Sequence, residues 1–160
     1  MRSEDEANRA LALYADTVRR ICLMHLKSIA DAEDVFQEVF LKYVLRDAPF
    51  DSAEHEKAWL IRVAINACRD TLKSFFRKNV VSLNELLTEP PDLRSHEKEL
   101  LEAVLALPEK YRDVIYLHYY EGYTAPEIAA LLGRKENTIY TWLARARGEL
   151  KRELGGDPLG

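Results

Sequence analysis

The chain has 160 residues, enough for one ordinary domain or two small ones, and 48% of them are hydrophobic against 31% charged, as in a packed globular protein. It carries 27 acidic and 23 basic side chains, and this acidic balance argues against a protein that coats DNA by charge alone. The sequence shows no apolar run of membrane-spanning length and no signal peptide at its start, so we expect a cytoplasmic protein without membrane insertion.

A first amphipathic helix is predicted over residues 31–46, with Asp31 as its N-cap. Its hydrophobic residues recur at helical spacing and define a buried face: Ala32, Val35, Phe36, Val39, Phe40 and Tyr43. The opposite face combines acceptors with leucines: Asp34, Gln37, Glu38, Leu41 and Leu45. Exposed leucines among polar neighbours predict a protein interface. The alternative is that Leu41 and Leu45 pack against other helices of the same domain.

A polar loop at about 47–56, which contains Phe50, precedes a second helix over residues 54–77. The loop has the composition to shape a pocket for an extruded base. One side of the helix is apolar: Leu60, Ile61, Ala64, Ile65, Cys68, Leu72 and Phe75. The other side lines up cations, an amide and an aromatic ring: Trp59, Arg62, Val63, Asn66, Arg69, Asp70 and Lys73. Such a stripe suits a nucleic-acid strand; a solvated face, with Trp59 in the core, is the alternative.

Helical periodicity weakens over residues 78–95, where Pro90 and Pro91 follow one another. This segment is predicted to be a linker, with a short helical turn at Leu83–Leu87. The fold class is therefore all-α, with two small helical domains at residues 4–77 and 96–154. Residues 79–133 hold ten acidic and four basic side chains, so basic character is confined to patches elsewhere.

Residues 121–147 are predicted to form a helix, a tight turn and a second helix. Thr124 and Glu127 have the spacing of a capping box, in which each side chain accepts the other residue's amide. Gly133 ends the first helix, because glycine adopts a left-handed conformation without steric penalty. The second helix must then begin near Arg134 or Lys135.

The second helix of this pair has the outer face of a DNA reader. Ile139, Leu143, Ala146 and Leu150 fall on its buried side, and small or hydrogen-bonding residues fall opposite: Asn137, Thr141, Ala144 and Gly148. Between Arg134 and Arg152 there are six cations and two acids, which suits phosphate contact. The pattern predicts a helix-turn-helix that enters a major groove. A plain helical hairpin with a solvated basic face is the alternative.

The cysteines and histidines of the chain are not spaced as in metal sites or catalytic sites. Cys22 and Cys68 form no CxxC pair, and the four histidines lack the spacing of metal ligands. We therefore expect buried, inert thiols, no metal, no cofactor and no catalytic residue, hence no enzyme.

Three segments together resemble bacterial RNA polymerase sigma factors of the extracytoplasmic-function (ECF) group. They are DAEDVFQEVFLKYV, WLIRVAINACRDTLK, and LPEKYRDVIYLHYYEGYTAPEIAALLGRKENTIYTWLARARGELKREL, in order over most of residues 5–154. The first two strings are specific as a pair, whereas the helix-turn-helix alone is not. The resemblance implies that residues 4–77 correspond to sigma region 2 and residues 96–154 to sigma region 4, joined by the linker 78–95.

The resemblance also implies partners and contacts. Core RNA polymerase would bind through its β′ clamp helices, to Asp34, Gln37, Glu38 and Leu41, and through its β flap. The minus-ten promoter element would be melted and captured by the loop at about 47–56, with Phe50, and by Arg62, Asn66 and Arg69. The minus-thirty-five duplex would meet Arg134, Lys135, Glu136, Asn137, Thr138, Tyr140, Thr141, Arg145 and Arg147. In this family an anti-sigma factor commonly covers these surfaces, and it can hold the protein at the membrane.

Trp142 departs from the family pattern, which usually has arginine there. It lies about 70° from the centre of the buried side, so we expect it to pack at the edge of the domain. Two other classes remain open from sequence: an autonomous helix-turn-helix regulator, against which the acidic balance counts, and an adaptor that mimics a sigma factor without binding DNA.

Overall fold

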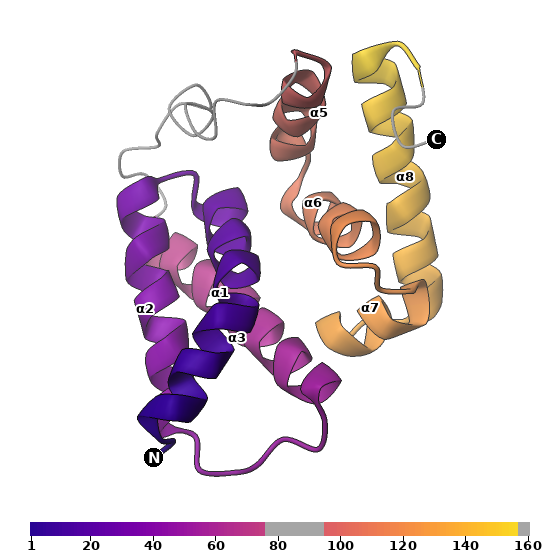
Figure 1. The fold of residues 1–160 in the computed structure, drawn as a ribbon. Helices are drawn as coiled ribbons and strands as arrows, with labels where there is room; N and C mark the ends of the chain where they lie inside the picture. The colour runs from indigo at the N-terminus through magenta and orange to yellow at the C-terminus, as the bar shows by residue number, and fades with distance from the viewer. Residues whose placement is uncertain (76–94, 157–160) are drawn as a thin grey trace. The chain divides into compact units, whose positions relative to one another are not determined.

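The computed structural model describes residues 1–75 and 95–156, and every regular element in these ranges is a helix, which confirms the all-α prediction. The chain divides into two compact units, Met1–Leu86 and Leu87–Gly160, each with its own helices (Figure 1). The predicted linker and its helical turn at Leu83–Leu87 lie outside the described residues, apart from Ser95, where a helix begins.

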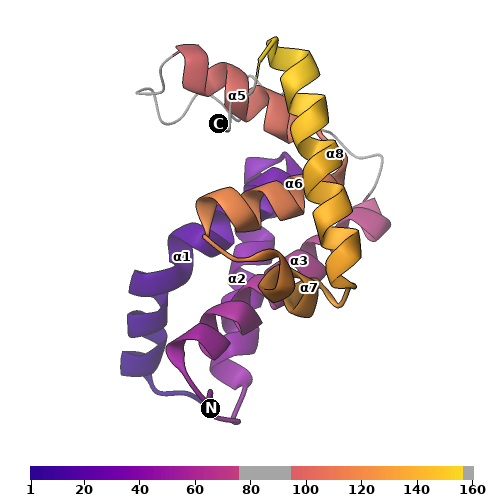
Figure 2. The same cartoon turned by 90° about the vertical axis from the view of Figure 1, so that its right-hand side faces the viewer.

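The first unit contains three helices: α1 (Glu4–Leu26), α2 (Ile29–Leu45) and α3 (Ala53–Phe75). α1 and α2 run side by side as a hairpin, and α3 packs against both of them (Figures 1 and 2). The predicted buried face of α2 is confirmed for all six residues, from Ala32 to Tyr43. On α3 the predicted side is buried from Leu60 to Cys68, and Leu72 is half-buried. Cys22 and Cys68 are buried thiols, as expected.

The prediction that Asp31 caps the α2 helix is wrong by one turn. Ser28 is the N-cap: its backbone is extended, its Oγ accepts the amide of Asp31 at 3.3 Å, and its carbonyl accepts the amide of Ala32 at 2.9 Å. Lys27 makes this possible by reversing the chain in a left-handed conformation (φ 52°). A serine directly after a single reversing residue lets α2 start at Ile29, closer to α1 than the sequence pattern indicates.

A buried carboxylate ties the three helices of the first unit together. Glu56 of α3 is 4% exposed, and its Oε2 accepts a hydrogen bond from the Tyr43 hydroxyl of α2 at 2.7 Å. Arg9 of α1 donates from Nη2 to both carboxylate oxygens, at 2.9 and 3.1 Å. Burial, and then the hydrogen bond to Glu56, raise the pKa of Tyr43 to about 12. The network pairs this buried carboxylate with a cation, as burial in a low-dielectric interior requires.

The second unit contains α5 (Ser95–Ala106), α6 (Glu109–Ile115), the π-helical turn η1 (Tyr116–Tyr120), α7 (Ala125–Leu132) and α8 (Glu136–Leu154). α8 packs against α5, α6 and α7 (Figure 2). Its predicted buried residues, from Ile139 to Leu150, are all buried. The π-helical turn was not predicted, because nothing in the hydrophobic spacing of residues 109–121 separates it from an α-helix.

Candidate functional sites

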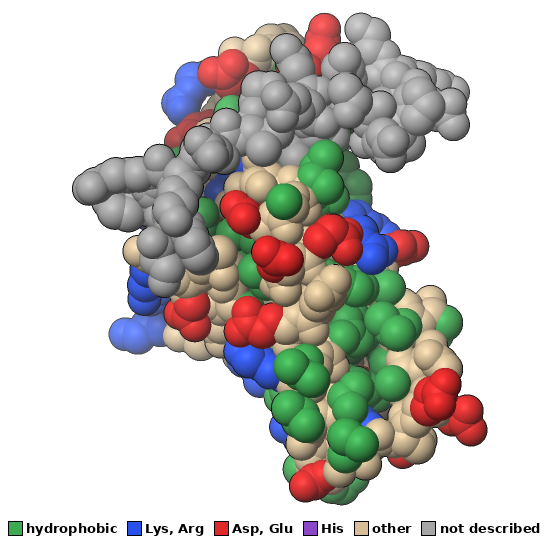
Figure 3. Space-filling model, turned by 90° about the vertical axis from the view of Figure 1, so that its left-hand side faces the viewer, with side chains coloured by type: hydrophobic (Ala, Val, Ile, Leu, Met, Phe, Trp, Pro, Cys, Tyr) green, Lys and Arg blue, Asp and Glu red, His purple; other side chains and the backbone are tan. Residues whose placement is uncertain are grey.

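The outer face of α2 is exposed as a continuous row. Asp34, Gln37 and Glu38 are exposed, and Leu41 and Leu45 have exposed fractions of 58% and 57%. The alternative that these leucines pack within the domain is therefore wrong. Figure 3 views the side on which α2 lies in Figure 1 and shows acidic and hydrophobic side chains next to each other there. Such a mixture is typical of a surface that a protein partner covers.

Glu38 is engaged only weakly by its own helix. Its Oε1 lies 3.2 Å from Nζ of Lys42, one turn further along α2, and both side chains are half exposed. An exposed pair at this spacing contributes about 0.3–0.5 kcal/mol. A cation of a partner protein can therefore replace Lys42 at small cost in free energy. The Glu38 carboxylate thus stays available for an interface.

Phe50 lies at the centre of an aromatic cluster in the α2–α3 loop. Its ring is parallel to that of Tyr43, with centroids 6.0 Å apart, and meets the rings of His55 and Trp59 edge-on at 5.2 and 5.6 Å. The guanidinium of Arg46 lies 4.5 Å from its centroid. Phe50 thus anchors the loop, and Trp59, half-buried at its edge, belongs to the same cluster instead of the helix core.

Arg2 fastens the same loop from the N-terminal side. Its Nη2 donates to the carbonyl oxygen of Ala48 at 2.7 Å, and its amide donates to that of Val44 at 2.8 Å. Its guanidinium also lies 4.7 Å from the centroid of Phe50. The backbone of the loop is therefore held in one conformation by these contacts. Sequence reasoning missed Arg2, because its position before α1 gives no hint of a contact with residues 44–50.

The predicted minus-ten residues of α3 share one face. Arg62, Asn66 and Arg69 follow one another at spacings of four and three, which places them along one side of a helix. Arg62 and Asn66 are exposed, and Arg69 is half-buried. Asp70 and Lys73, also predicted for this side, are exposed, and Val63 is half-buried. α3 therefore presents three cations, an amide and a carboxylate on its polar side.

The turn between α7 and α8 has the predicted local chemistry. The Thr124 amide donates to Oε1 of Glu127 at 2.9 Å, and the Glu127 amide donates to Oγ1 of Thr124 at 3.3 Å, which completes the capping box. The backbone hydrogen bond from Thr124 lowers the pKa of Glu127. Gly133 ends α7 in the left-handed region (φ 69°), and α8 begins at Glu136 with Lys135 as its N-cap.

Thr124→Ala is expected to lower the free energy of unfolding by about 1 kcal/mol, because the first-turn amide of Glu127 loses its acceptor. Urea denaturation followed by circular dichroism measures this. Thr124→Ser, which keeps the hydroxyl, is the control and should stay close to the parent chain. Equal stability of all three chains would contradict the role given to the capping box.

α8 and the turn before it present most of the predicted minus-thirty-five residues to solvent. Exposed are Arg134, Lys135, Glu136, Asn137, Tyr140, Thr141 and Arg145, whereas Thr138 and Arg147 are half-buried. The Thr141 hydroxyl donates to the carbonyl of Asn137 at 2.9 Å, so its oxygen faces outward as an acceptor only. Trp142 is half-buried, with Lys110 and Arg134 at 5.5 and 5.7 Å from its ring, which confirms its predicted place at the domain edge.

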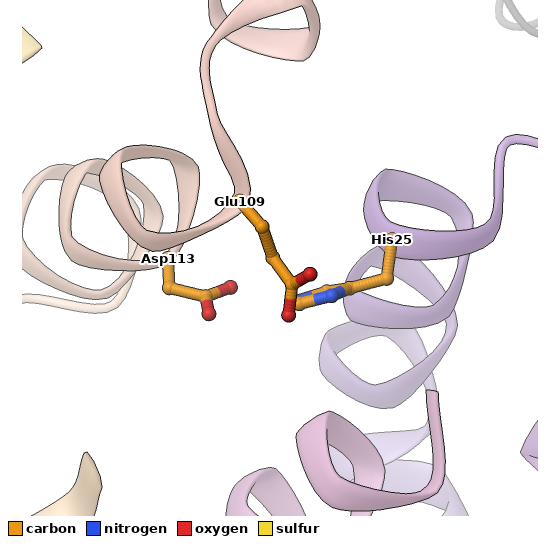
Figure 4. A group of neighbouring side chains, drawn as sticks. All are labelled: His25, Glu109 and Asp113. Atoms are coloured by element: carbon orange, nitrogen blue, oxygen red, sulfur yellow. The ribbon is translucent and has the colours of Figure 1, made fainter. Parts of the chain in front are cut away.

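Three potential metal ligands are drawn in Figure 4: His25 of α1 and the carboxylates Glu109 and Asp113 of α6. The carboxylates are one turn apart on the same helix of the second unit, whereas the histidine belongs to the first unit. Within either unit alone, this group therefore offers at most two ligands. Among the described helices, none is both long and apolar enough to cross a membrane.

Both halves of the chain match family models. Residues 11–78 match the model described as Sigma-70 region 2, and residues 97–150 match Sigma-70, region 4. Together the two matches cover well over half of the chain and include α2, α3, α7 and most of α8.

Two curated proteins show the extent of the similarity. The ECF RNA polymerase sigma factor SigW of Bacillus subtilis is 26% identical over 89% of this chain and 85% of its own length. The probable RNA polymerase sigma factor RfaY of Xanthomonas campestris is 28% identical over 91% of this chain, which spans 40% of that protein's length.

A solved structure shows the same fold. The sigma factor RpoE of Bartonella quintana, crystallised with the anti-sigma factor NepR, superposes at a TM-score of 0.74 with 20% identity, over 94% of this chain and 97% of that one.

Proposed function

This chain belongs to the sigma-70 family of RNA polymerase sigma factors, in its extracytoplasmic-function group, and we propose that it binds core RNA polymerase and directs it to specific promoters. The observation that carries the proposal is the exposed row on α2. Asp34, Gln37, Glu38 and Leu41 form a face on which an apolar side chain is left in water beside acidic ones, in a chain that also has a helix proposed to read DNA. The polymerase's β′ clamp helices are its proposed partner, and the β flap is the proposed partner of the second unit.

We further propose that the first unit captures the melted minus-ten strand. Arg62, Asn66 and Arg69 would meet the strand along the polar side of α3, by charge contact and hydrogen bonding. Phe50 would act mainly by fixing the loop, since its ring is already surrounded by other rings and cations. The preformed loop supports this role, because an ordered site loses less conformational entropy when a base enters it.

The second unit would bind the minus-thirty-five duplex with α8 in the major groove. Asn137 suits the edge of an adenine and Glu136 the amino group of a cytosine, while Arg145 and Arg147 suit phosphates. Arg134, Lys135, Thr138, Tyr140 and Thr141 complete the proposed surface. The proposed domains are residues 4–77 and 96–154, joined by a linker over residues 78–95. The family models match residues 11–78 and 97–150.

An anti-sigma factor is a proposed third partner, because a structural neighbour was crystallised with one. It would cover the same faces of α2 and α8. The protein is proposed to act where the polymerase is, in the cytoplasm, and to contribute no catalytic residue of its own, since the polymerase makes the transcript.

Run-off transcription tests the proposal. Purified core polymerase, the chain and a library of promoter fragments should give promoter-specific transcripts only when both proteins are present. The competing function, an autonomous helix-turn-helix regulator, predicts tight and specific duplex binding by the chain alone. That result, without any effect on transcription, would overturn the proposed function.

Asn137→Ala is expected to weaken binding of the polymerase complex to its best minus-thirty-five duplex about tenfold, since a bidentate contact to adenine is worth about 1–2 kcal/mol. The preference at one base pair should relax at the same time. Filter binding with single-base variants of the duplex measures both effects. In contrast, Arg145→Ala should weaken all duplexes alike, and an unchanged base preference in Asn137→Ala would refute direct reading by that side chain.

A further inference from the structure

The π-helical turn η1 is the least expected element of the second unit. The amide of Glu121 donates to the carbonyl of Tyr116 at 3.2 Å, five residues back. Side-chain contacts fix the turn: the Tyr116 hydroxyl donates to the Glu121 carboxylate, and Nδ1 of His118 lies 2.7 Å from the carbonyl oxygen of Tyr123. Turns of this kind are rare and occur frequently at functional sites. The turn inserts one residue into the helix and so changes which side chains face α8.

Tyr119 of this turn contacts α8. Its hydroxyl accepts a hydrogen bond from Nε of Arg147, and the guanidinium carbon lies 5.5 Å from the centroid of its ring. The ring is itself held edge-on by His118, with centroids 4.8 Å apart. Arg147 is therefore fixed by a hydrogen bond and a cation–π contact from one side chain, whose own position is set by the π-helical turn.

The Arg147 side chain keeps most of its donors after this contact. A guanidinium has five N–H groups, and Tyr119 takes only the one on Nε. Among the described residues, no hydrogen bond occupies Nη1 or Nη2, so four donors remain in a planar fork that matches a phosphate. Arg147 also follows Tyr140 by seven residues, which puts it on the same edge of α8 as that exposed ring.

We infer that Tyr119 is a positioning residue for DNA binding, which orients the Arg147 guanidinium toward a backbone phosphate of the minus-thirty-five duplex. The inference rests on the proposed function. A free arginine must lose its rotamer freedom when it binds, whereas one already tethered through Nε loses less and so binds more tightly. Tyr119 itself touches no DNA in this arrangement; it acts only through Arg147.

A double-mutant cycle tests the inference in the full chain bound to core polymerase. Tyr119→Phe keeps the ring and removes the hydroxyl, and it should weaken binding to a minus-thirty-five duplex about threefold to tenfold. Arg147→Ala should weaken binding about tenfold and lower the slope of log affinity against log salt by about one. Tyr119→Phe should then have no further effect in the Arg147→Ala chain, since the two residues act as one unit.

Additive losses in the double variant would overturn the inference, because Tyr119 would then act independently of Arg147. An Arg147→Ala chain with unchanged affinity and salt slope would overturn it as well. Arg145→Ala separates these failures from that of the proposed function. If Arg145→Ala still weakens duplex binding, the minus-thirty-five assignment stands and only the inference fails; if no α8 variant affects binding, both fail.

Discussion

Replacing Asp34 and Glu38 together by alanine is expected to weaken binding of the chain to core RNA polymerase about 100-fold, or about 3 kcal/mol. Both carboxylates are exposed on α2 beside Leu41, and a partner that covers Leu41 also removes water from around them. Truncating them leaves the partner's cations buried without a counter-charge, which is the larger part of the loss. Competition against a labelled sigma factor for a fixed amount of core polymerase measures the change.

A matched control distinguishes the loss of a direct contact from the loss of net negative charge. Asp5 and Asp16 are exposed acids of α1, so Asp5→Ala with Asp16→Ala removes the same net charge from the same unit. This chain should bind polymerase like the parent, and both double variants should keep the parent's helical content. If the two double variants lose affinity equally, the effect is one of overall charge and α2 is not the docking face.

Glu56→Ala is expected to lower the free energy of unfolding of the first unit by about 3 kcal/mol, in the range found when one partner of a buried pair is removed. The Tyr43 hydroxyl would lose its acceptor inside the core, and Arg9 would lose its counter-charge. Because Arg9 is half exposed and can be hydrated again, most of the loss should come from Tyr43.

The chain offers a specific probe for this measurement. Trp59 lies in the first unit and Trp142 in the second, so a Trp142→Phe background leaves one tryptophan that reports on the first unit alone. Urea titration in that background gives the free energy with and without Glu56→Ala. Tyr43→Phe, which removes the hydroxyl together with its need for an acceptor, should cost less. A larger loss in Tyr43→Phe than in Glu56→Ala would contradict this account.

The raised pKa of Tyr43 adds a pH dependence with a definite sign. Its stabilising contribution is complete below pH 10, the ordinary value, and is lost as the pH rises through about 12, where the folded tyrosine ionises. The Tyr43→Phe chain should therefore lose less stability over that interval than the parent chain.

Elements whose structure depends on neighbouring residues in the sequence were predictable. The capping box of Thr124 and Glu127, the glycine turn and the two faces of α8 follow from spacing and backbone preference alone, and the structure confirms them. The exposed face of α2 was predictable as one of two alternatives. Only the packing of the three helices decides between them, because periodicity shows which residues share a face and not what covers it.

Features that depend on distant parts of the chain were not predictable. Glu56 looks like an ordinary first-turn acid of a helix, and only the approach of Arg9 and Tyr43 buries it. The cap of α2 was misplaced because Ser28 and Asp31 are both good caps, and the reversal at Lys27 decides between them. The π-helical turn has no signature in hydrophobic spacing, so the contact of Tyr119 with Arg147 could not be foreseen.

The anchored ring of Phe50 has a consequence for how this protein can change over evolution. Without that anchor, residues 46–52 would form a single loop between α2 and α3. Any insertion or deletion in that loop would then shift its whole backbone. Because Phe50 is held near the middle of the connection, the segments before and after it behave as two short loops, or arcs. Each arc has its own entropy of loop closure, so a residue added to one of them leaves the other in place. Changes in one arc can therefore accumulate with no need to refold the helices beneath it.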